Sequence, residues 1–282
     1  MKTIITVILY NKEMDDSETL RQLIHSLCDD CNLLIINNGP KHIKVKDKIY
    51  NRLVNSFNDV EVKEYIDNRP LSWIYNDVLK HSVADRYIFL DDDSHLDPLF
   101  FDKINGCYNK SIDLQLPLIF ETTDKKLYYP LVEKQVFNGQ DGDIINARLN
   151  ILSIGSGLVI YKSIIEKFSS NNLELFDEKF ALYGVDFSFF RRMQSVAKNN
   201  AINVQIVSFI EHSLSRTSTD YNEWRHRERL YDSALSIRFY SKNAFFSILR
   251  LLKLISKEIM SYRINNVFLI IKTFWVGKHP RC

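Results

Sequence analysis

Three consecutive carboxylates, Asp91, Asp92 and Asp93, directly follow the apolar residues 88–90. Packing explains the apolar residues, but adjacent carboxylates repel one another unless water or a cation offsets their charge. Oxygen ligands at the carboxyl end of a strand suit Mg²⁺ or Mn²⁺, which typically bridge protein carboxylates to substrate phosphates. The alternative is an acidic turn that caps a helix starting near Asp97 and Pro98. The surrounding chain favours the metal site.

Polar residues also follow the other strands that the sequence predicts. Hydrophobic runs over residues 3–10, 33–36, 60–66 and 87–90 indicate strands, and apolar residues at helical spacing over 17–28 and 71–82 indicate helices between them. This alternation predicts an α/β fold with a mostly parallel sheet flanked by helices. Ligands bind beyond the carboxyl ends of the strands in such sheets. Asn11, Asn38, Arg69 and the three Asp residues stand at those ends, where a nucleotide would lie.

Charge divides the chain into two parts. The 282 residues are 45% hydrophobic and contain few Gly or Pro, so we expect one main domain over residues 1–220. Residues 221–282 contain 12 Lys and Arg against 4 Asp and Glu, whereas residues 1–220, the body of the chain, contain 25 Lys and Arg against 31 Asp and Glu. The first strand begins too early for a signal peptide, and no apolar run near the C-terminus approaches the ~20 residues that span a bilayer. We therefore expect a cytoplasmic protein with a basic helical tail.

The four cysteines, Cys28, Cys31, Cys107 and Cys282, show no disulfide framework. Cys28 and Cys31 form a CxxC pair, but no second pair completes a zinc site. We therefore expect neither redox chemistry nor metal binding at these cysteines.

Several motifs, in this order and spacing, resemble those of the inverting family 2 glycosyltransferases with a GT-A fold. Residues 6–11 look like the opening strand of that family, residues 36–40 like its second-strand loop, and Asn68, Arg69 and Asn76 like its Asn-rich helix start. Residues 91–93 sit where its DxD motif falls, and residues 155–161, 176–180 and 183–186 are similar to its acceptor-side block. The bacterial enzymes that build O-antigen and capsule polysaccharides are the most similar group, with rhamnosyl, galactosyl or galactofuranosyl transfer as the implied activities.

The resemblance implies a role for each matching position. It makes residues 1–110 the nucleotide-sugar-binding half and residues 111–220 the acceptor half. Asp93 and His212 would hold Mn²⁺ or Mg²⁺, and Asp186 would be the catalytic base. The donor nucleotide sugar would be contacted by Tyr10, Asn11, Asn38, Arg69, Asp91 and Asp92. The chain departs from the family at Val185, where Glu is usual, and at Ser188, which is commonly acidic.

The chemistry of sugar transfer explains why such residues are needed. The bond between the anomeric carbon and the diphosphate breaks, and a cation neutralises the charge that grows on the leaving oxygens. Inversion also requires a base on the opposite face of the sugar to take the proton of the acceptor hydroxyl. Asp186 is the candidate, because the N-terminus of the helix predicted after it favours the ionised carboxylate. The alternative is an ordinary helix N-cap.

The other candidates also have structural alternatives. The donor-side Asn residues could equally be turn residues, since Asn favours such positions. His212 follows the strand predicted over residues 202–209 and could be a surface residue. We expect Trp73 to pack in the core. Gly155 and Gly157 could permit close approach of an acceptor sugar or simply form a tight bend.

Other classes of protein fit the sequence less well. A nucleotidyltransferase usually needs a Gly-rich basic loop after the first strand, and residues 10–14 contain no Gly. No P-loop motif occurs, and no nucleic-acid-binding motif accompanies the basic tail. A non-catalytic sugar-binding or scaffold protein with a transferase fold remains the alternative, with Val185 and Ser188 as its support. The expected function is metal-dependent, inverting transfer from a UDP-, dTDP- or GDP-sugar to a lipid-linked or polysaccharide acceptor.

The tail contains an amphipathic segment. Phe245, Ile248, Leu252, Ile255 and Ile259 fall on one helical face, whereas Arg250, Lys253 and Lys257 fall on the other. Such a helix can lie in a membrane surface or pack on the catalytic domain. The basic excess favours the first, which predicts a peripheral protein on the anionic inner face of the cell membrane.

Overall fold

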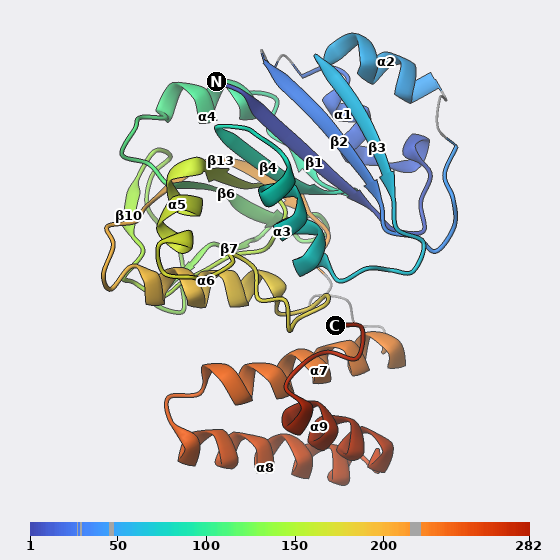
Figure 1. Ribbon diagram of the computed structural model, residues 1–282, viewed down its shortest axis with the longest axis vertical. Helices are drawn as coiled ribbons and strands as arrows, with labels where there is room; N and C mark the ends of the chain where they lie inside the picture. The colour runs from blue at the N-terminus through green and yellow to red at the C-terminus, as the bar shows by residue number, and fades with distance from the viewer. Residues whose placement is uncertain (27, 29, 45–47, 215–220) are drawn as a thin grey trace.

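The computed structural model describes residues 1–26, 28, 30–44, 48–214 and 221–282. Its first half is a parallel sheet in the order β3, β2, β1, β4 (Figure 1). The strands are β1 (Thr3–Leu9), β2 (Cys31–Asn37), β3 (Asp59–Glu64) and β4 (Arg86–Asp91). Their carboxyl ends therefore meet at one edge, as the sequence predicted.

The second half of the sheet is mixed. The strand β12 (Leu158–Tyr161) lies antiparallel between β4 and β6 (Leu114–Glu121), and β13 (Asn203–His212) lies parallel to β6. Because β12 runs against β4, the turn that precedes it lies at the carboxyl end of β4. The remaining strands are β5 (His95–Leu96), β7 (Leu127–Tyr129) and β10 (Ile144–Asn146) in this sheet, and β8 (Leu131–Val132), β9 (Gln135–Val136) and β11 (Ile151–Leu152) in a small separate sheet.

Helices cover both faces of the large sheet, and the alternation of β1 side chains feeds both cores. Ile4 and Ile8 pack in the core that contains residues of α3 (Leu71–His81), α5 (Lys162–Ser169) and α6 (Val185–Val196). Ile5, Val7 and Leu9 pack in the core that contains residues of α1 (Glu18–Leu23), α2 (Lys48–Ser56) and α4 (Phe100–Cys107). A short 3-10 helix, η1 (Met14–Asp16), precedes α1. These observations confirm the predicted α/β class, a mostly parallel sheet flanked by helices.

The C-terminal part is helical. The helices are α7 (Glu223–Tyr240), α8 (Ala244–Met260) and α9 (Ile264–Val276), and Asn222 and Asn243 cap the first two. A small apolar core of Leu230, Ala234, Leu269 and Ile270 joins α7 to α9. The boundary expected near residue 220 falls outside the described residues. Within the described ranges, no helix combines the length and the apolar character that crossing a membrane would require.

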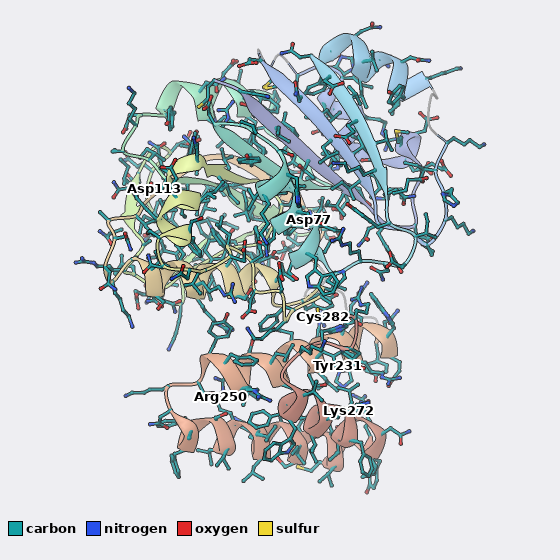
Figure 2. The ribbon with its side chains drawn as sticks, viewed as in Figure 1. Asp77, Asp113, Tyr231, Arg250, Lys272 and Cys282 are labelled. Carbon is teal, nitrogen blue, oxygen red and sulfur yellow. A yellow bond between two sulfur atoms is a disulfide. The ribbon has the colours of Figure 1, made fainter. Side chains whose placement is uncertain are left out.

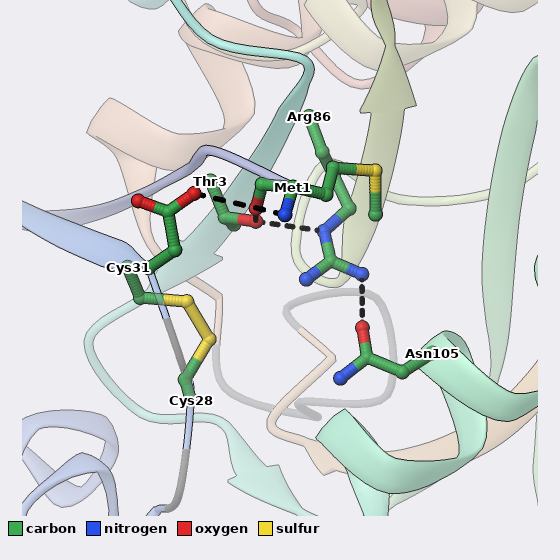
Figure 3. Close-up of a disulfide and its surroundings, with 7 residues drawn as sticks. Met1, Thr3, Cys28, Cys31, Arg86 and Asn105 are labelled. Carbon is green, nitrogen blue, oxygen red and sulfur yellow. Dashed lines mark hydrogen bonds and ion pairs between the residues drawn. A yellow bond between two sulfur atoms is a disulfide. The ribbon is translucent and has the colours of Figure 1, made fainter.

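The amino ends of the strands are fastened at the opposite edge of the sheet (Figure 3). The buried Arg86 donates to Thr3 Oγ1 at 3.1 Å and to Asn105 Oδ1 at 2.7 Å, which joins β4 to β1 and α4. Cys28 and Cys31 form a disulfide with a Cα separation of 5.7 Å, a bond that the sequence analysis did not predict. These contacts tie β1, β4 and α4 together at the amino edge of the sheet.

Candidate functional site

The acidic turn after β4 is held rigidly by its neighbours. Ser156 Oγ accepts a hydrogen bond from the backbone N–H of Asp91 at 3.0 Å, and Thr19 Oγ1 donates to the backbone carbonyl of Asp91 at 2.6 Å. Ser17, which also caps α1, donates from its hydroxyl to the carbonyl of Asp92 at 2.9 Å. The carboxylates of this turn therefore project from a backbone that α1 and the turn before β12 fix in place.

His212 brings the far end of the sheet to this turn. Its Nδ1 lies 3.1 Å from Asp93 Oδ1, and its Nε2 lies 3.5 Å from Asp91 Oδ2. Ser94 Oγ lies 3.3 Å from the same Nδ1 of His212. The same Ser94 Oγ also lies 2.6 Å from Ser156 Oγ. His212 is buried, so the alternative of a surface histidine is wrong. The two residues expected to hold a metal are thus direct neighbours, although they lie 119 positions apart in the sequence.

The electrostatics of the cluster follow from burial and from these ion pairs. Burial raises the pKa of Asp91 to about 6, against the opposing effect of His212. Burial also acts to raise the pKa of Asp93, but the hydrogen bond and charge of His212 outweigh it and leave that pKa lowered. Burial acts to lower the pKa of His212, yet its bond to Asp93 and the charges of Asp91 and Asp93 leave it raised. The cluster therefore stabilises a charged imidazolium against Asp93.

The donor atoms of this cluster fit a divalent cation in chemical type. Carboxylate oxygens and an imidazole nitrogen are common ligands of Mn²⁺, and the oxygens also suit Mg²⁺. Across the described ranges, however, no group of three or more His, Cys, Asp or Glu side chains is arranged to hold a metal ion. In this arrangement the two nitrogens of His212 contact the two carboxylates instead.

Asp92 has a different partner from its neighbours. It forms an ion pair with Lys12 and accepts a hydrogen bond from the backbone N–H of Tyr10 at 3.4 Å. Burial raises the pKa of Asp92, and Lys12 partly offsets this effect. Sequence analysis missed Lys12, and the available signal was its place directly after Asn11 at the end of β1. Lys12 sets a positive charge beside the acidic turn.

The donor-side residues at the ends of β1 and β2 lie together. Asn11 has φ of 51° and donates from its backbone N–H to Gly39 O at 2.7 Å, so it is a turn residue. Asn38 is buried and donates from Nδ2 to Arg69 O at 2.9 Å. Its Oδ1 has no hydrogen-bond partner in the part of the chain that the structure describes. An unpaired buried acceptor of this kind is uncommon in folded proteins.

Arg69 borders a hollow beside these residues. Its Nη2 lies 2.6 Å from Asp77 Oδ2, and its guanidinium lies 4.8 Å from the centre of the Tyr65 ring. Trp73 lines the same hollow and is only partly buried, so the expectation that it packs in the core was wrong. The hollow encloses about 490 Å³ and is lined by Tyr65, Asp67, Asn68, Arg69, Pro70, Trp73 and Arg281. Aromatic faces and guanidinium groups of this kind can hold a base or a sugar.

Arg281 of the C-terminal tail forms part of the wall of this hollow, a connection that sequence analysis did not make. Arg281 donates from Nη1 to Asn68 O at 3.1 Å and pairs through Nη2 with Glu228 at 2.8 Å. His279 donates from its backbone N–H to Lys179 O at 2.9 Å. The tail therefore returns from α9 to the carboxyl edge of the sheet.

Asp186 lies in the first turn of α6, after Gly184 with φ of 81°. A Cβ added to Gly155 would lie 2.6 Å from Asp186 Oδ1, so the absence of a side chain at position 155 makes room for this carboxylate. The charge of Asp186 acts together with Asp91 to raise the pKa of Tyr75, for which burial is the largest cause. It also acts on the pKa of His212. Asp186 therefore belongs to the same electrostatic neighbourhood as the acidic turn.

The turn before β12 connects the two groups of carboxylates. Gly155 touches Asp186, while the next residue, Ser156, bonds both Asp91 and Ser94. Gly157 has φ of 84° and donates from its N–H to Phe89 O at 2.8 Å, which locks the turn onto β4. Glycine at position 155 therefore leaves space for Asp186, and glycine at position 157 permits the positive φ of the turn. Sequence analysis singled out the glycines but missed Ser156 and Ser94.

The two departures from the family pattern are core positions. Val185 is fully buried, and the buried Ser188 donates from its hydroxyl to Val185 O at 2.7 Å. Ser188 Oγ also accepts from the backbone N–H of Asp177 at 3.4 Å. Both residues therefore pack the start of α6.

No protein-family model and no curated protein matches the sequence. Solved structures match its fold. TarS of S. aureus has a TM-score of 0.53 and 14% identity, covering 92% of this chain and 43% of the TarS chain. The complex of TarS 1–349 with UDP-GlcNAc has a TM-score of 0.53 and 13% identity, covering 95% of this chain and 73% of the TarS chain. The complex of TarS 1–349 with UDP has a TM-score of 0.52 and 12% identity, covering 99% of this chain and 93% of the TarS chain. This chain thus spans less than half of the longer TarS chain, and the likeness establishes a shared fold.

Proposed function

We propose that this chain is an inverting glycosyltransferase that uses a nucleotide-diphosphate sugar as donor. The observation that carries the proposal is the Gly155–Ser156 connection, which places Asp186 beside the turn of Asp91 and Asp93 at the carboxyl edge of a parallel sheet. The fold is shared with TarS, which has been crystallised with UDP-GlcNAc and UDP. A site with two separated sets of carboxylates suits a reaction that needs a base on one face of a sugar and charge neutralisation on the other.

The residues of the chain divide the work between donor and acceptor. Tyr10, Asn38 and Arg69 would orient the nucleotide. Lys12 would face the diphosphate. Asp186 takes the proton of the acceptor hydroxyl as its oxygen bonds to the anomeric carbon, and the bond from that carbon to the diphosphate breaks on the opposite face. The nucleoside diphosphate leaves with the electron pair, so the configuration inverts.

A divalent cation, Mn²⁺ or Mg²⁺, is part of the proposal. Asp93 and His212 would hold it, with Asp91 and Asp92 directed at the donor. When bound, such a cation supplies Lewis-acid stabilisation of the negative charge on the diphosphate. In the structure the two nitrogens of His212 contact Asp91 and Asp93 directly, so a bound cation would replace these ion pairs.

For the substrates, a UDP-sugar is the first choice of donor, and dTDP- and GDP-sugars are the other candidates. A lipid-linked or polysaccharide acceptor at the cytoplasmic face of the membrane would place the enzyme in the synthesis of a surface polysaccharide such as O-antigen or capsule. The basic tail supports work at an anionic surface. The competing function is a non-catalytic sugar-binding or scaffold protein with a transferase fold.

A donor panel separates these two functions. Purified protein is incubated with UDP-, dTDP- and GDP-sugars, in Mn²⁺, in Mg²⁺ and in EDTA, and nucleotide release is measured with and without acceptor glycans. The proposal expects release from one nucleotide class that depends on the metal. Tight donor binding by calorimetry without release or transfer, across a wide acceptor panel, would favour the scaffold.

A further inference from the structure

The helices α8 and α9 expose apolar side chains instead of burying them. The apolar strips, by which we mean the outward side chains of these helices, are Phe245, Ile248, Leu249, Leu252 and Ile259 on α8 and Ile264, Phe268, Ile271 and Trp275 on α9, all exposed. The exposed fraction reaches 70% for Phe245 and 73% for Trp275. The spacing of each strip follows one face of its helix.

The helices already have a buried face of their own. Ser247 and Glu258 of α8 are buried, and Leu251, Leu254 and Ile255 pack against the core of Leu269 and Ile270. The apolar strips therefore lie on sides of the helices that the fold does not cover. Large apolar side chains that share one exposed face of a helix mark an interaction site.

Cations border the strips without exposed acids between them. The helices α8 and α9 contain four Lys and Arg and a single acid, Glu258. Glu258 is buried and is occupied by His226 at 3.0 Å and by Asn266 at 2.9 Å, so it does not offset the surface charge. Figure 2 shows Arg250 on α8 and Lys272 on α9, in the helical part of the molecule. Exposed cations beside an apolar strip are the pattern of a helix that lies in a lipid interface.

We infer that the apolar strips of α8 and α9 insert into the surface of an anionic lipid bilayer, with Arg250, Lys253, Lys257 and Lys272 at the headgroups. The positive charge of this surface favours anionic lipid over a second copy of the chain as its partner. A two-fold contact with a second copy would bring two surfaces of the same positive charge together, which repel, whereas anionic lipid offsets their charge. The strips supply the apolar contact that a purely electrostatic patch lacks.

Docking in this way gives the site an orientation. The α7, α8 and α9 layer lies on the side of the sheet toward which the strands β1 to β3 point, and α8 is its outermost helix (Figure 1). The carboxyl edge would therefore face the membrane across this helical layer. The docking rests on the surface of α8 and α9 alone, whereas its use in presenting a lipid-linked acceptor rests on the proposed function.

Vesicle flotation tests the docking without any measurement of activity. The full chain is mixed with vesicles of phosphatidylcholine alone and with vesicles that contain phosphatidylglycerol. We expect it to float with the anionic vesicles and to be released at high salt. Changing Lys253, Lys257 and Lys272 to Gln should weaken the partition by about a hundredfold, whereas changing the exposed body residues Lys110, Lys162 and Lys198 to Gln should not.

The apolar contribution is tested separately. Leu252→Ser with Phe268→Ser should weaken binding to anionic vesicles, while Val83→Ser, at an exposed position of the body, should not. In a Trp73→Phe, Trp224→Phe background, the fluorescence of Trp275 should shift to the blue when anionic vesicles are added. Equal partition into neutral and anionic vesicles, or no binding to anionic vesicles, would overturn the inference. A dimer that Leu252→Ser with Phe268→Ser dissociates in light scattering would then assign the strips to a second copy of the chain.

Discussion

Gly155 lies against the carboxylate of Asp186, so closely that a Cβ at position 155 would come within 2.6 Å of Asp186 Oδ1. A side chain there would push the carboxylate away from its place beside the acidic turn. We expect Gly155→Ala to lower kcat by about a hundredfold, because a shift of about 1 Å in a reacting group can cost that much. The Kd for the donor should stay within a few-fold, since Gly155 does not line the hollow beside Arg69.

Gly106→Ala is the matched control for this substitution. A Cβ added at position 106 would meet no atom within 4 Å, so the same chemical change has room there. Turnover in Gly106→Ala should equal that of the unsubstituted chain. If Gly155→Ala also turned over at that rate, the position of Asp186 would not matter for the reaction.

The parts of this site that the sequence predicted are those carried by strands and their ends. Buried β-strand runs place Asn38 and Asp91 at carboxyl ends, and parallel pairing then brings those ends together. The contact of His212 with Asp93 depends on the placement of β13 across the sheet, which no local pattern encodes. The contact of Arg281 with Asn68 joins residues 213 positions apart and depends on the packing of α7 and α9.

Local sequence patterns also did not predict the burial of some side chains correctly. Trp73 fits the apolar spacing of α3, but it lies at the edge of that helix beside the Arg69 hollow, and its Nε1 donates to Glu178 O at 3.1 Å. The apolar face of α8 has the spacing expected for either a packed or a membrane-surface helix, and only the tertiary structure shows that α7 and α9 occupy its other side.

Metal binding at the acidic turn is tested by calorimetry. Asp93→Asn should abolish the binding of Mn²⁺ in the presence of UDP, because it removes the charge of one expected ligand. Asp102→Asn, an exposed carboxylate on α4, is the control and should leave the titration unchanged. Unaltered Mn²⁺ binding by Asp93→Asn would remove Asp93 from the metal site.

Lys12 should act on donor binding. Replacing it with Met removes a cation beside the expected diphosphate and leaves the partly buried Asp92 without its ion pair. We expect the Kd for the nucleotide sugar to rise by about tenfold, while Lys12→Arg retains most of the affinity, since charged hydrogen bonds contribute about 1.5–3 kcal/mol. Equal affinities of the Met and Arg variants, measured by calorimetry, would contradict this role.

The tail should stabilise the fold in a pH-dependent manner through Glu228. Burial acts to raise the pKa of Glu228, but His279 and Arg281 outweigh it and leave that pKa lowered in the folded state. A lowered folded-state pKa stabilises the fold above the unfolded-state pKa, and this stabilisation is lost as the pH falls through the folded-state pKa. Glu228→Gln should therefore lower the free energy of unfolding by about 1–3 kcal/mol at pH 7.

The difference between Glu228→Gln and the unsubstituted chain should shrink below about pH 4, near the ordinary pKa of Glu. Urea unfolding followed by circular dichroism at pH 7 and at pH 3.5 measures it. Glu166→Gln, at an exposed position of α5, serves as the control. A difference of the same size at both pH values would mean that Glu228 contributes through packing and not through its charge.

The single-turnover rate of Asp186→Asn, with the donor identified by the panel, tests the proposed mechanism most directly. Asn keeps the size of the side chain beside Gly155 but cannot accept the proton of the acceptor hydroxyl. We expect donor affinity within a few-fold of the unsubstituted chain and a rate lower by about 10²–10⁴. A rate equal to that of the unsubstituted chain on the same acceptor would contradict Asp186 as the base and, with it, the proposed mechanism.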